Sequence, residues 1–163
     1  MSECRSFSYQ INNQSKILIL GSMPGVKSLE LQEYYAHPQN RFWKVMGALC
    51  HCPDLAELKY DEKINVLLNS GFALWDTISF CKREGSLDSD IVEEVPNNIP
   101  DLLKKYNNIK IIILNGNKSY STFKKCFPEL LTTYTCIKVP STSPANARFT
   151  LEKLILEWKK VVE

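Results

Sequence analysis

Two short segments in the first quarter of the chain combine residue types that could bind a flat, polar molecule. Residues 21–25, Gly-Ser-Met-Pro-Gly, follow an apolar run, and their glycines allow several backbone N–H groups to point into one space. Residues 37–43, His-Pro-Gln-Asn-Arg-Phe-Trp, place an amide, Asn40, beside two aromatic side chains. Such a turn can hold an anion or the polar edge of a ring, and an aromatic face can stack on the ring itself. Taken alone, the glycine turn is equally typical of an ordinary tight turn.

The pattern of apolar residues predicts a sheet that would position these segments. Four short apolar runs are typical of strands buried on both faces, namely residues 16–21, 72–75, 109–114 and 136–139. Helical spacing of apolar residues occurs at 40–50, 61–69, 99–106, 117–127 and 150–162. This alternation indicates one α/β domain over residues 1–163, a three-layer αβα arrangement with a central four-stranded, mainly parallel sheet. Residues 79–98 are expected to form a long polar loop or a short-helix insertion.

Polar residues follow the second and third of these predicted strands. Ligands of open parallel sheets bind beyond the carboxyl ends of the strands, so both positions are candidates. Asp76 could orient a water or the edge of a base, although a carboxylate there often caps the local backbone. Asn115 could donate and accept hydrogen bonds together, or form an ordinary turn before Gly116.

The fourth predicted strand runs into a loop with the composition of a phosphate contact. Residues 140–148 read Pro-Ser-Thr-Ser-Pro-Ala-Asn-Ala-Arg, and their hydroxyl groups are donors of the kind that bind phosphate. The net charge of +2 divides into −4 over residues 1–100 and +6 over residues 101–163. A basic half can serve a polyanion such as DNA, or it can form solvated helical faces.

The sequence lacks the motifs of several common classes of site. Neither G-x-x-x-x-G-K-[ST] nor G-x-G-x-x-G follows the first predicted strand, and G-x-S-x-G is missing from the sequence. The six cysteines are scattered, and the one-residue spacing of Cys50 and Cys52 suits a metal poorly. We therefore expect reduced thiols and no metal or organic cofactor. A nucleophile–base pair at Cys50 and His51 is disfavoured because adjacent residues on a helix point apart.

The chain also lacks the sequence signals of membrane insertion and secretion. No apolar run approaches the roughly 20 residues that a membrane-spanning helix needs. The first residues have no apolar core like that of a signal peptide. These features predict a cytoplasmic protein that does not enter a membrane.

The motifs together resemble those of the uracil-DNA glycosylase superfamily. Residues 21–25 resemble its first motif, and residues 37–44, HPQNRFWK, resemble the HPxNRFWK stretch of the mismatch-specific uracil and thymine glycosylases. Residues 140–148 lie where the superfamily has a second, Ser-Pro or Ser-Gly motif that presses on DNA. With LWDT and REGSLDSDI added, the chain looks most like the hypoxanthine-DNA, or deoxyinosine, glycosylase branch, over about residues 14 to 160.

This resemblance implies roles for individual residues. Phe42 matches the aromatic that stacks on the flipped base, and Asn40 matches the asparagine that holds the attacking water in this branch. Asn115 is implicated in base recognition or catalysis. Met23 stands where most members have Asn or Asp, which puts ordinary uracil-glycosylase activity in doubt. The remaining expected contacts with the base or the DNA are Gly21, Ser22, Pro24, Gly25 and Asp76, and Ser141, Thr142, Ser143, Pro144, Ala145, Asn146 and Arg148.

Some features of the chain depart from the superfamily or leave alternatives open. Ala145 lies where many relatives have a leucine wedge, so Asn146 or Arg148 would have to fill the gap unless flipping needs little help. The cysteines do not reproduce the iron–sulfur ligand set of certain branches. His37 is either a rival acid–base group or a residue that shapes its loop.

The resemblance implies a monofunctional, monomeric enzyme that acts on DNA with a deaminated base and leaves an abasic site. No lysine stands out as a Schiff-base nucleophile. Uracil or xanthine as the released base is one alternative. A non-catalytic nucleic-acid-binding domain on the same fold is another, and Met23 is its best support.

Overall fold

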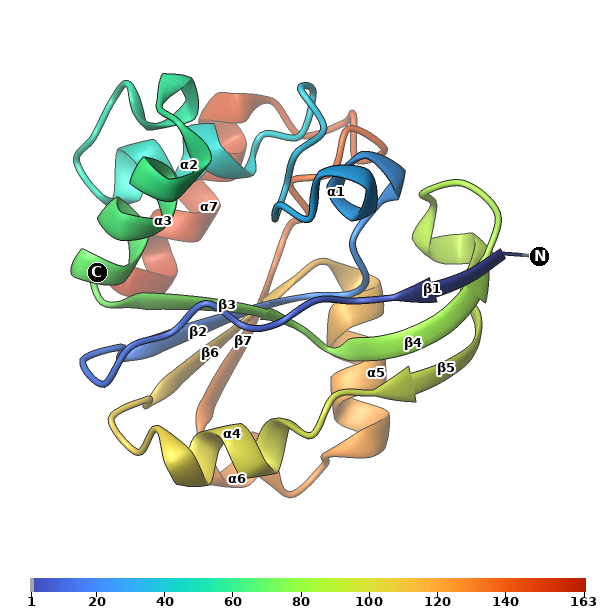
Figure 1. The fold of residues 1–163 in the computed structure, drawn as a ribbon. Helices are drawn as coiled ribbons and strands as arrows, with labels where there is room; N and C mark the ends of the chain where they lie inside the picture. The colour runs from blue at the N-terminus through green and yellow to red at the C-terminus, as the bar shows by residue number, and fades with distance from the viewer. Residues whose placement is uncertain (1) are drawn as a thin grey trace.

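A four-stranded parallel sheet forms the centre of the protein. The computed structural model describes residues 2–163, so Met1 of the predicted domain lies outside the described residues. The strand order is β3 (Phe72–Asp76), β2 (Ile17–Gly21), β6 (Ile111–Asn115) and β7 (Thr135–Val139), all parallel (Figure 1). The four predicted strands and the α/β fold class are therefore confirmed, with ends that differ by at most two residues.

Helices cover both faces of this sheet, as the apolar spacing predicted (Figure 1). One face packs against α2 (Phe42–Leu49), α3 (Tyr60–Asn69) and α7 (Leu151–Val162), through core residues that include Met46, Leu67 and Trp158. The other face packs against α4 (Ile99–Lys105), α5 (Asn117–Cys126) and α6 (Leu130–Thr133). Successive strand residues alternate between the two cores because side chains of a strand point to opposite faces. Short elements that the apolar spacing did not predict are α1 (Val26–Leu31), α6 and η1 (Leu55–Glu57).

The expectation of a loop or helical insertion at residues 79–98 was wrong for most of that segment. It forms β4 (Ile78–Arg83), η2 (Asp88–Asp90) and β5 (Val92–Pro96), which pair with β1 (Ser2–Arg5) in a second, antiparallel sheet of order β1-β4-β5. The sequence did not predict these strands because the register of the β4–β5 pairing shifts between Ile78 and Lys82. The shifts break the alternation of apolar and polar residues. Side chains of β1 and β4 pack with Met23 in a small core of their own.

Register fixes which residues meet at the carboxyl edge of the main sheet. Gly21 lies opposite Asp76, and Asn115 lies opposite Val139, so these strand ends finish at the same level. The turn after β2, the residue that ends β3 and the loop after β7 therefore emerge together.

Residues 2–163 lack the features of a membrane-spanning helix and of a metal site. No helix there is long and apolar enough to cross a membrane. No group of three or more His, Cys, Asp or Glu side chains there could hold a metal ion. All six cysteines lie in this part of the chain and are free.

Candidate active site

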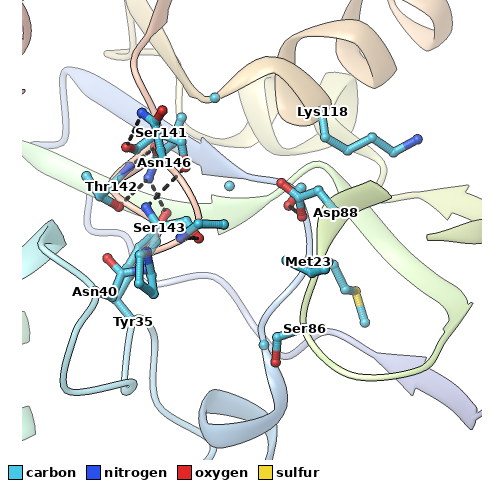
Figure 2. Close-up of a pocket in the computed structure, with 18 of the residues that line it drawn as sticks. Met23, Tyr35, Asn40, Ser86, Asp88, Lys118, Ser141, Thr142, Ser143 and Asn146 are labelled. Atoms are coloured by element: carbon cyan, nitrogen blue, oxygen red, sulfur yellow. Dashed lines mark hydrogen bonds between the residues drawn. The ribbon is translucent and has the colours of Figure 1, made fainter. Parts of the chain in front are cut away.

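A cavity of about 1110 Å³ opens at the carboxyl edge of the main sheet. All but one of the predicted site residues line it: Gly21, Ser22, Met23, Pro24, Gly25, Asn40, Asp76, Asn115, Ser141, Thr142, Ser143, Pro144, Ala145, Asn146 and Arg148. Figure 2 shows Tyr35, Asn40 and the loop after β7 on one side, and Met23, Ser86 and Asp88 on the other. The structure thus brings together segments that lie up to about 130 residues apart in the sequence.

Phe42 is the exception, because it does not reach the cavity. Its side chain is fully buried, and the ring of Tyr35 covers its face with a centroid distance of 3.8 Å and an interplanar angle of 15°. Tyr35 lines the cavity instead. In this structure Phe42 therefore supports the ring that faces the cavity, and its expected stacking on the base stays a prediction. The Tyr34-Tyr35 pair just before the HPQNRFWK stretch was the available sequence signal.

Tyr35 has an unusual backbone conformation for a large side chain. Its φ angle is +55°, in the left-handed region that non-glycine residues rarely adopt. Such conformations are held by the surrounding structure and are concentrated at functional sites. The conformation directs the ring into the cavity, flat against Phe42.

The side-chain amide of Asn115 makes three hydrogen bonds within the protein. Its Nδ2 donates to the hydroxyl oxygen of Tyr35 and to Oγ1 of Thr142, each at 3.2 Å. Its Oδ1 accepts the backbone N–H of Thr142 at 3.2 Å. Burial raises the pKa of Tyr35 well above its usual range, so the phenol is neutral. Asn115 therefore joins the ring that faces the cavity to the loop after β7.

Arg41 holds that loop from behind, a role that the sequence did not indicate. Its guanidinium donates to the backbone oxygens of Ser143 and Asn146, each at 3.0 Å, and to that of Phe149. Its backbone N–H donates to the oxygen of Thr142 at 3.1 Å. Its Nε is buried and has no hydrogen-bond partner among the described residues.

The side chain of Asn146 belongs to the same loop structure. Its Nδ2 donates to the backbone oxygen of Ser141 at 3.0 Å, as the dashed lines in Figure 2 mark. It therefore stabilises the loop from within. Ala145 and Arg148 are exposed, which leaves the Arg148 guanidinium accessible at the rim of the cavity.

Asn40 lies at the cavity wall just before α2. Its Oδ1 accepts the backbone N–H of Phe42 at 2.9 Å, which fixes the orientation of the amide. An amide oxygen has two lone pairs, so a second donor can still be bound. Nearby, Nδ1 of His37 accepts the N–H of Gln39 at 3.1 Å, which supports a role of His37 in shaping the loop.

Asp76 is a buried carboxylic acid at the floor of the cavity. A Cβ atom on Gly21 would come within 2.6 Å of Asp76 Oδ1 and 3.0 Å of the Tyr35 hydroxyl oxygen, so only glycine fits there. Oδ2 of Asp76 is buried and has no hydrogen-bond partner within residues 2–163. Burial and the nearby Asp88 carboxylate raise the pKa of Asp76 from 3.8 to about 7, against the opposing effect of Arg83.

The segment between β4 and β5 supplies residues that the sequence had not assigned to the site. Asp88 accepts a hydrogen bond from the Ser22 hydroxyl at 2.6 Å, and burial raises its pKa. Arg83 is almost fully buried and donates to the backbone oxygens of Pro24 and Ser86. The Ser86 hydroxyl accepts the N–H of Val26 at 2.9 Å. These contacts fix the shape of the 21–25 turn.

Met23 anchors this turn by its side chain. It is buried with Cys4, Ile78, Cys81 and Ile91 in the core of the antiparallel sheet. The side chain therefore holds the turn against this core.

Comparison with known proteins places the chain in a family. Residues 8–160 match the family model described as the uracil DNA glycosylase superfamily. The hypoxanthine DNA glycosylase of Methanosarcina acetivorans is 33% identical over 159 residues, 96% of each chain. That of Methanosarcina barkeri is 36% identical over 115 residues, 71% of this chain and 72% of the relative.

A solved structure agrees with this assignment. The solution NMR structure of a candidate uracil DNA glycosylase from Methanosarcina acetivorans superposes with a TM-score of 0.82 at 28% identity. The match covers 99% of this chain and 100% of that one. The sequence match and the shared fold together mean that the chain belongs to the uracil DNA glycosylase superfamily.

Proposed function

We propose that this protein is a monofunctional DNA glycosylase that releases hypoxanthine from deoxyinosine in DNA and leaves an abasic site. One observation carries the proposal: Tyr35, Asn40 and Asp76 share one cavity in a chain whose relatives of similar length are named hypoxanthine DNA glycosylases. A glycosylase must take its base out of the helix to reach the glycosidic bond. The cavity volume is slightly above the roughly 300–1,000 Å³ of typical ligand sites, which leaves room for a purine.

The extrahelical base would stack on Tyr35. The ring is stacked on Phe42 behind it, so it forms a rigid flat surface of the kind that bases pack against. The 21–25 turn and Asp76 would then meet the polar edge of the base. Asn115 acts in this scheme as a positioning residue, because its hydrogen bonds hold Tyr35 and Thr142.

Asn40 would hold the water that attacks C1′ of the sugar. An amide oxygen does not accept a proton at neutral pH, so Asn40 orients the water without deprotonating it. That is sufficient when the sugar develops oxocarbenium character before attack, because the water then needs placement more than activation. The Phe42 N–H occupies one lone pair of this oxygen, and the second lone pair would accept the water.

The loop of residues 141–148 would contact the DNA backbone. Its shape is fixed from behind by Arg41, and its exposed Arg148 can reach a phosphate. Ala145 is too small to act as a wedge between bases, so we assign no wedge residue.

The test is base release from oligonucleotides that carry one deoxyinosine, deoxyuridine or deoxyxanthosine, single- and double-stranded, with alkali to cut abasic sites. Asn40→Ala is expected to lower the single-turnover rate on deoxyinosine by roughly 100- to 1000-fold, about 2.7–4 kcal/mol, with DNA binding little changed. Gln39→Ala is the matched control, since Gln39 is exposed in the same loop and does not line the cavity. A fall of less than roughly tenfold would remove Asn40 from the catalytic step.

Other outcomes of the same assay distinguish the alternatives. Release from deoxyuridine or deoxyxanthosine alone would keep the mechanism and change the substrate. DNA binding without release of any base would identify a binding domain, as Met23 suggested. Borohydride trapping of a covalent protein–DNA adduct would contradict the monofunctional mechanism.

We also propose that the enzyme is a cytoplasmic monomer. The six free cysteines support a reducing compartment. One cavity holds every residue that the reaction uses, which supports action as a single chain. Sedimentation equilibrium with and without DNA would test the monomer.

A further inference from the structure

Asp76 lines the cavity, and one of its carboxyl oxygens is buried without a partner in the folded protein. The side chain is 4% exposed, and no group among residues 2–163 forms a hydrogen bond with its Oδ2. A buried polar atom without a partner is unfavourable by about 1–3 kcal/mol, so its presence in a carboxyl group that lines a cavity indicates that a ligand engages this group.

The position of the carboxyl group relates it to a bound base. A point 2.6 Å from Asp76 Oδ1 lies only 3.0 Å from the Tyr35 hydroxyl oxygen, so the carboxyl group is beside the hydroxyl end of the stacking ring. A base that stacks on that ring would present an edge to Asp76. Purine edges carry ring nitrogens with lone pairs, which accept hydrogen bonds.

We propose that Asp76 is a catalytic residue that donates a proton from its carboxyl group to a ring nitrogen of the leaving hypoxanthine. The inference rests on the proposed function and deepens it. Asn40 and Asp76 then act at the two ends of one reaction, with Asn40 placing the water and Asp76 neutralising the leaving base. Neither the turn at residues 21–25 nor Asn115 can supply this proton, because their groups are amides or hydroxyls.

The surroundings of Asp76 favour the protonated acid near neutral pH. Burial raises its pKa most, the Asp88 carboxylate on η2 adds to the rise, and Arg83 on β4 opposes it, which together bring the pKa to about 7. Arg83 is committed to the backbone oxygens of Pro24 and Ser86, so it forms no ion pair with Asp76. The other titratable groups that interact with Asp76 are the neutral phenols Tyr34, Tyr35 and Tyr60.

The reaction balances without a co-reactant. The bond between C1′ and N9 breaks, and both of its electrons leave with the base. The O–H bond of Asp76 breaks, and its proton joins the ring nitrogen, so that hypoxanthine leaves as a neutral molecule. The water oxygen held by Asn40 bonds to C1′, and the proton that this water loses restores the acid form of Asp76.

The experiment measures single-turnover hypoxanthine release between about pH 5.5 and 9 by the wild-type protein and Asp76→Asn. Loss of a general acid is expected to lower the rate by roughly 100-fold or more at the acid end. The wild-type rate should fall roughly tenfold per pH unit above about pH 7, and the variant should lose this fall. Asp88→Asn keeps an oxygen acceptor for Ser22 and should move the midpoint of the fall to lower pH, because it removes a neighbouring negative charge.

Substrate analogues identify the interaction itself. Oligonucleotides with 7-deaza- or 3-deaza-deoxyinosine lack one ring nitrogen each. On the analogue that lacks the accepting nitrogen, the wild-type rate should fall to that of Asp76→Asn on deoxyinosine, with little further fall when both changes are combined. Thermal unfolding and DNA binding of each variant establish that the protein is folded and binds its substrate.

Three results would overturn the inference. One is an Asp76→Asn rate within roughly tenfold of wild type at the acid end. Another is a wild-type rate that does not fall above pH 7. The third is strictly additive effects of Asp76→Asn and both analogues, which would make Asp76 a binding contact. If the wild-type protein releases no hypoxanthine at all, the proposed function fails, and this inference fails with it.

Discussion

The two walls of the cavity differ in how their polar groups are satisfied. On the amide wall, formed by Tyr35, Asn115 and Thr142, the Asn115 side chain makes three hydrogen bonds within the protein. On the acidic wall, formed by Ser22, Asp76 and Asp88 and supported by the buried Arg83, Oδ2 of Asp76 and Nε of Arg83 have no hydrogen-bond partner in the described chain.

This difference indicates that the two walls have different roles. A satisfied network is rigid and fixes geometry, which is what a stacking surface and a DNA-contacting loop require. An unsatisfied acid makes the folded protein less stable than it could be, and such local strain is typical of functional sites. Changes on the amide wall should therefore lower stability, whereas the right change on the acidic wall should raise it.

The largest effect should come from the acidic wall, with Asp76→Asn. The pKa of Asp76 is raised from 3.8 to about 7 by folding, so the folded state retains a proton that the unfolded state loses. The wild-type protein should therefore lose up to about 4 kcal/mol of stability as pH rises from about 4 to 7, and the variant should lack that loss. Urea unfolding at about pH 4.5 and 8 measures it. An equal pH dependence in both proteins would mean that Asp76 is ionised in the folded state.

Arg41→Met tests the support behind the loop and should have the next largest effect. The substitution leaves three backbone oxygens without their charged donor, so unfolding free energy should fall by about 3 kcal/mol. Lys44→Met is the matched control, since Lys44 is exposed on the adjacent α2 and should change stability by less than about 0.5 kcal/mol. Equal effects of the two variants would remove Arg41 as the support of the loop.

The sequence predicts those parts of the site that are positioned by regular, locally recognisable elements. Parallel strands leave a local apolar run, and residues at their ends must meet at one edge, so Asp76, Asn115 and the 141–148 loop were predictable. Arg83 and Asp88 were not, because β4 and β5 are short and irregular, with no clear period-two pattern.

The choice between Phe42 and Tyr35 shows a second limit. Both are aromatic and seven positions apart, and the motif drew attention to Phe42. The left-handed backbone conformation of Tyr35 decides which ring faces the cavity. Glycine is the residue type that indicates such a conformation in a sequence, and Tyr35 is not a glycine. The role of Arg41 is likewise hidden, because its partners are backbone oxygens more than 100 residues away.

Asn115→Ala removes the side chain that joins the members of the amide wall. It leaves the N–H of Thr142 and the hydroxyls of Thr142 and Tyr35 without their partner, so stability should fall by about 2 kcal/mol. The single-turnover rate should fall as well, because the ring and the loop lose their fixed separation. Thermal unfolding and base release measure the two effects. A lower rate with full stability would mean that Asn115 touches the substrate directly.

The smallest effect should come from Tyr35→Phe, which removes the hydroxyl that lies between the two walls and keeps the ring stacked on Phe42. The variant loses the hydrogen bond from Asn115, so stability should fall by about 1 kcal/mol, and the single-turnover rate by less than roughly tenfold. The double variant with Asn115→Ala should be less destabilised than the sum of the two, because both remove the same hydrogen bond. A rate loss well above tenfold would show that the hydroxyl contributes more to the reaction rate than the stacking face of the ring. Since a Cβ on Gly21 would lie close to both this hydroxyl and Asp76 Oδ1, that result would mean that Tyr35 positions the acid as well as the base.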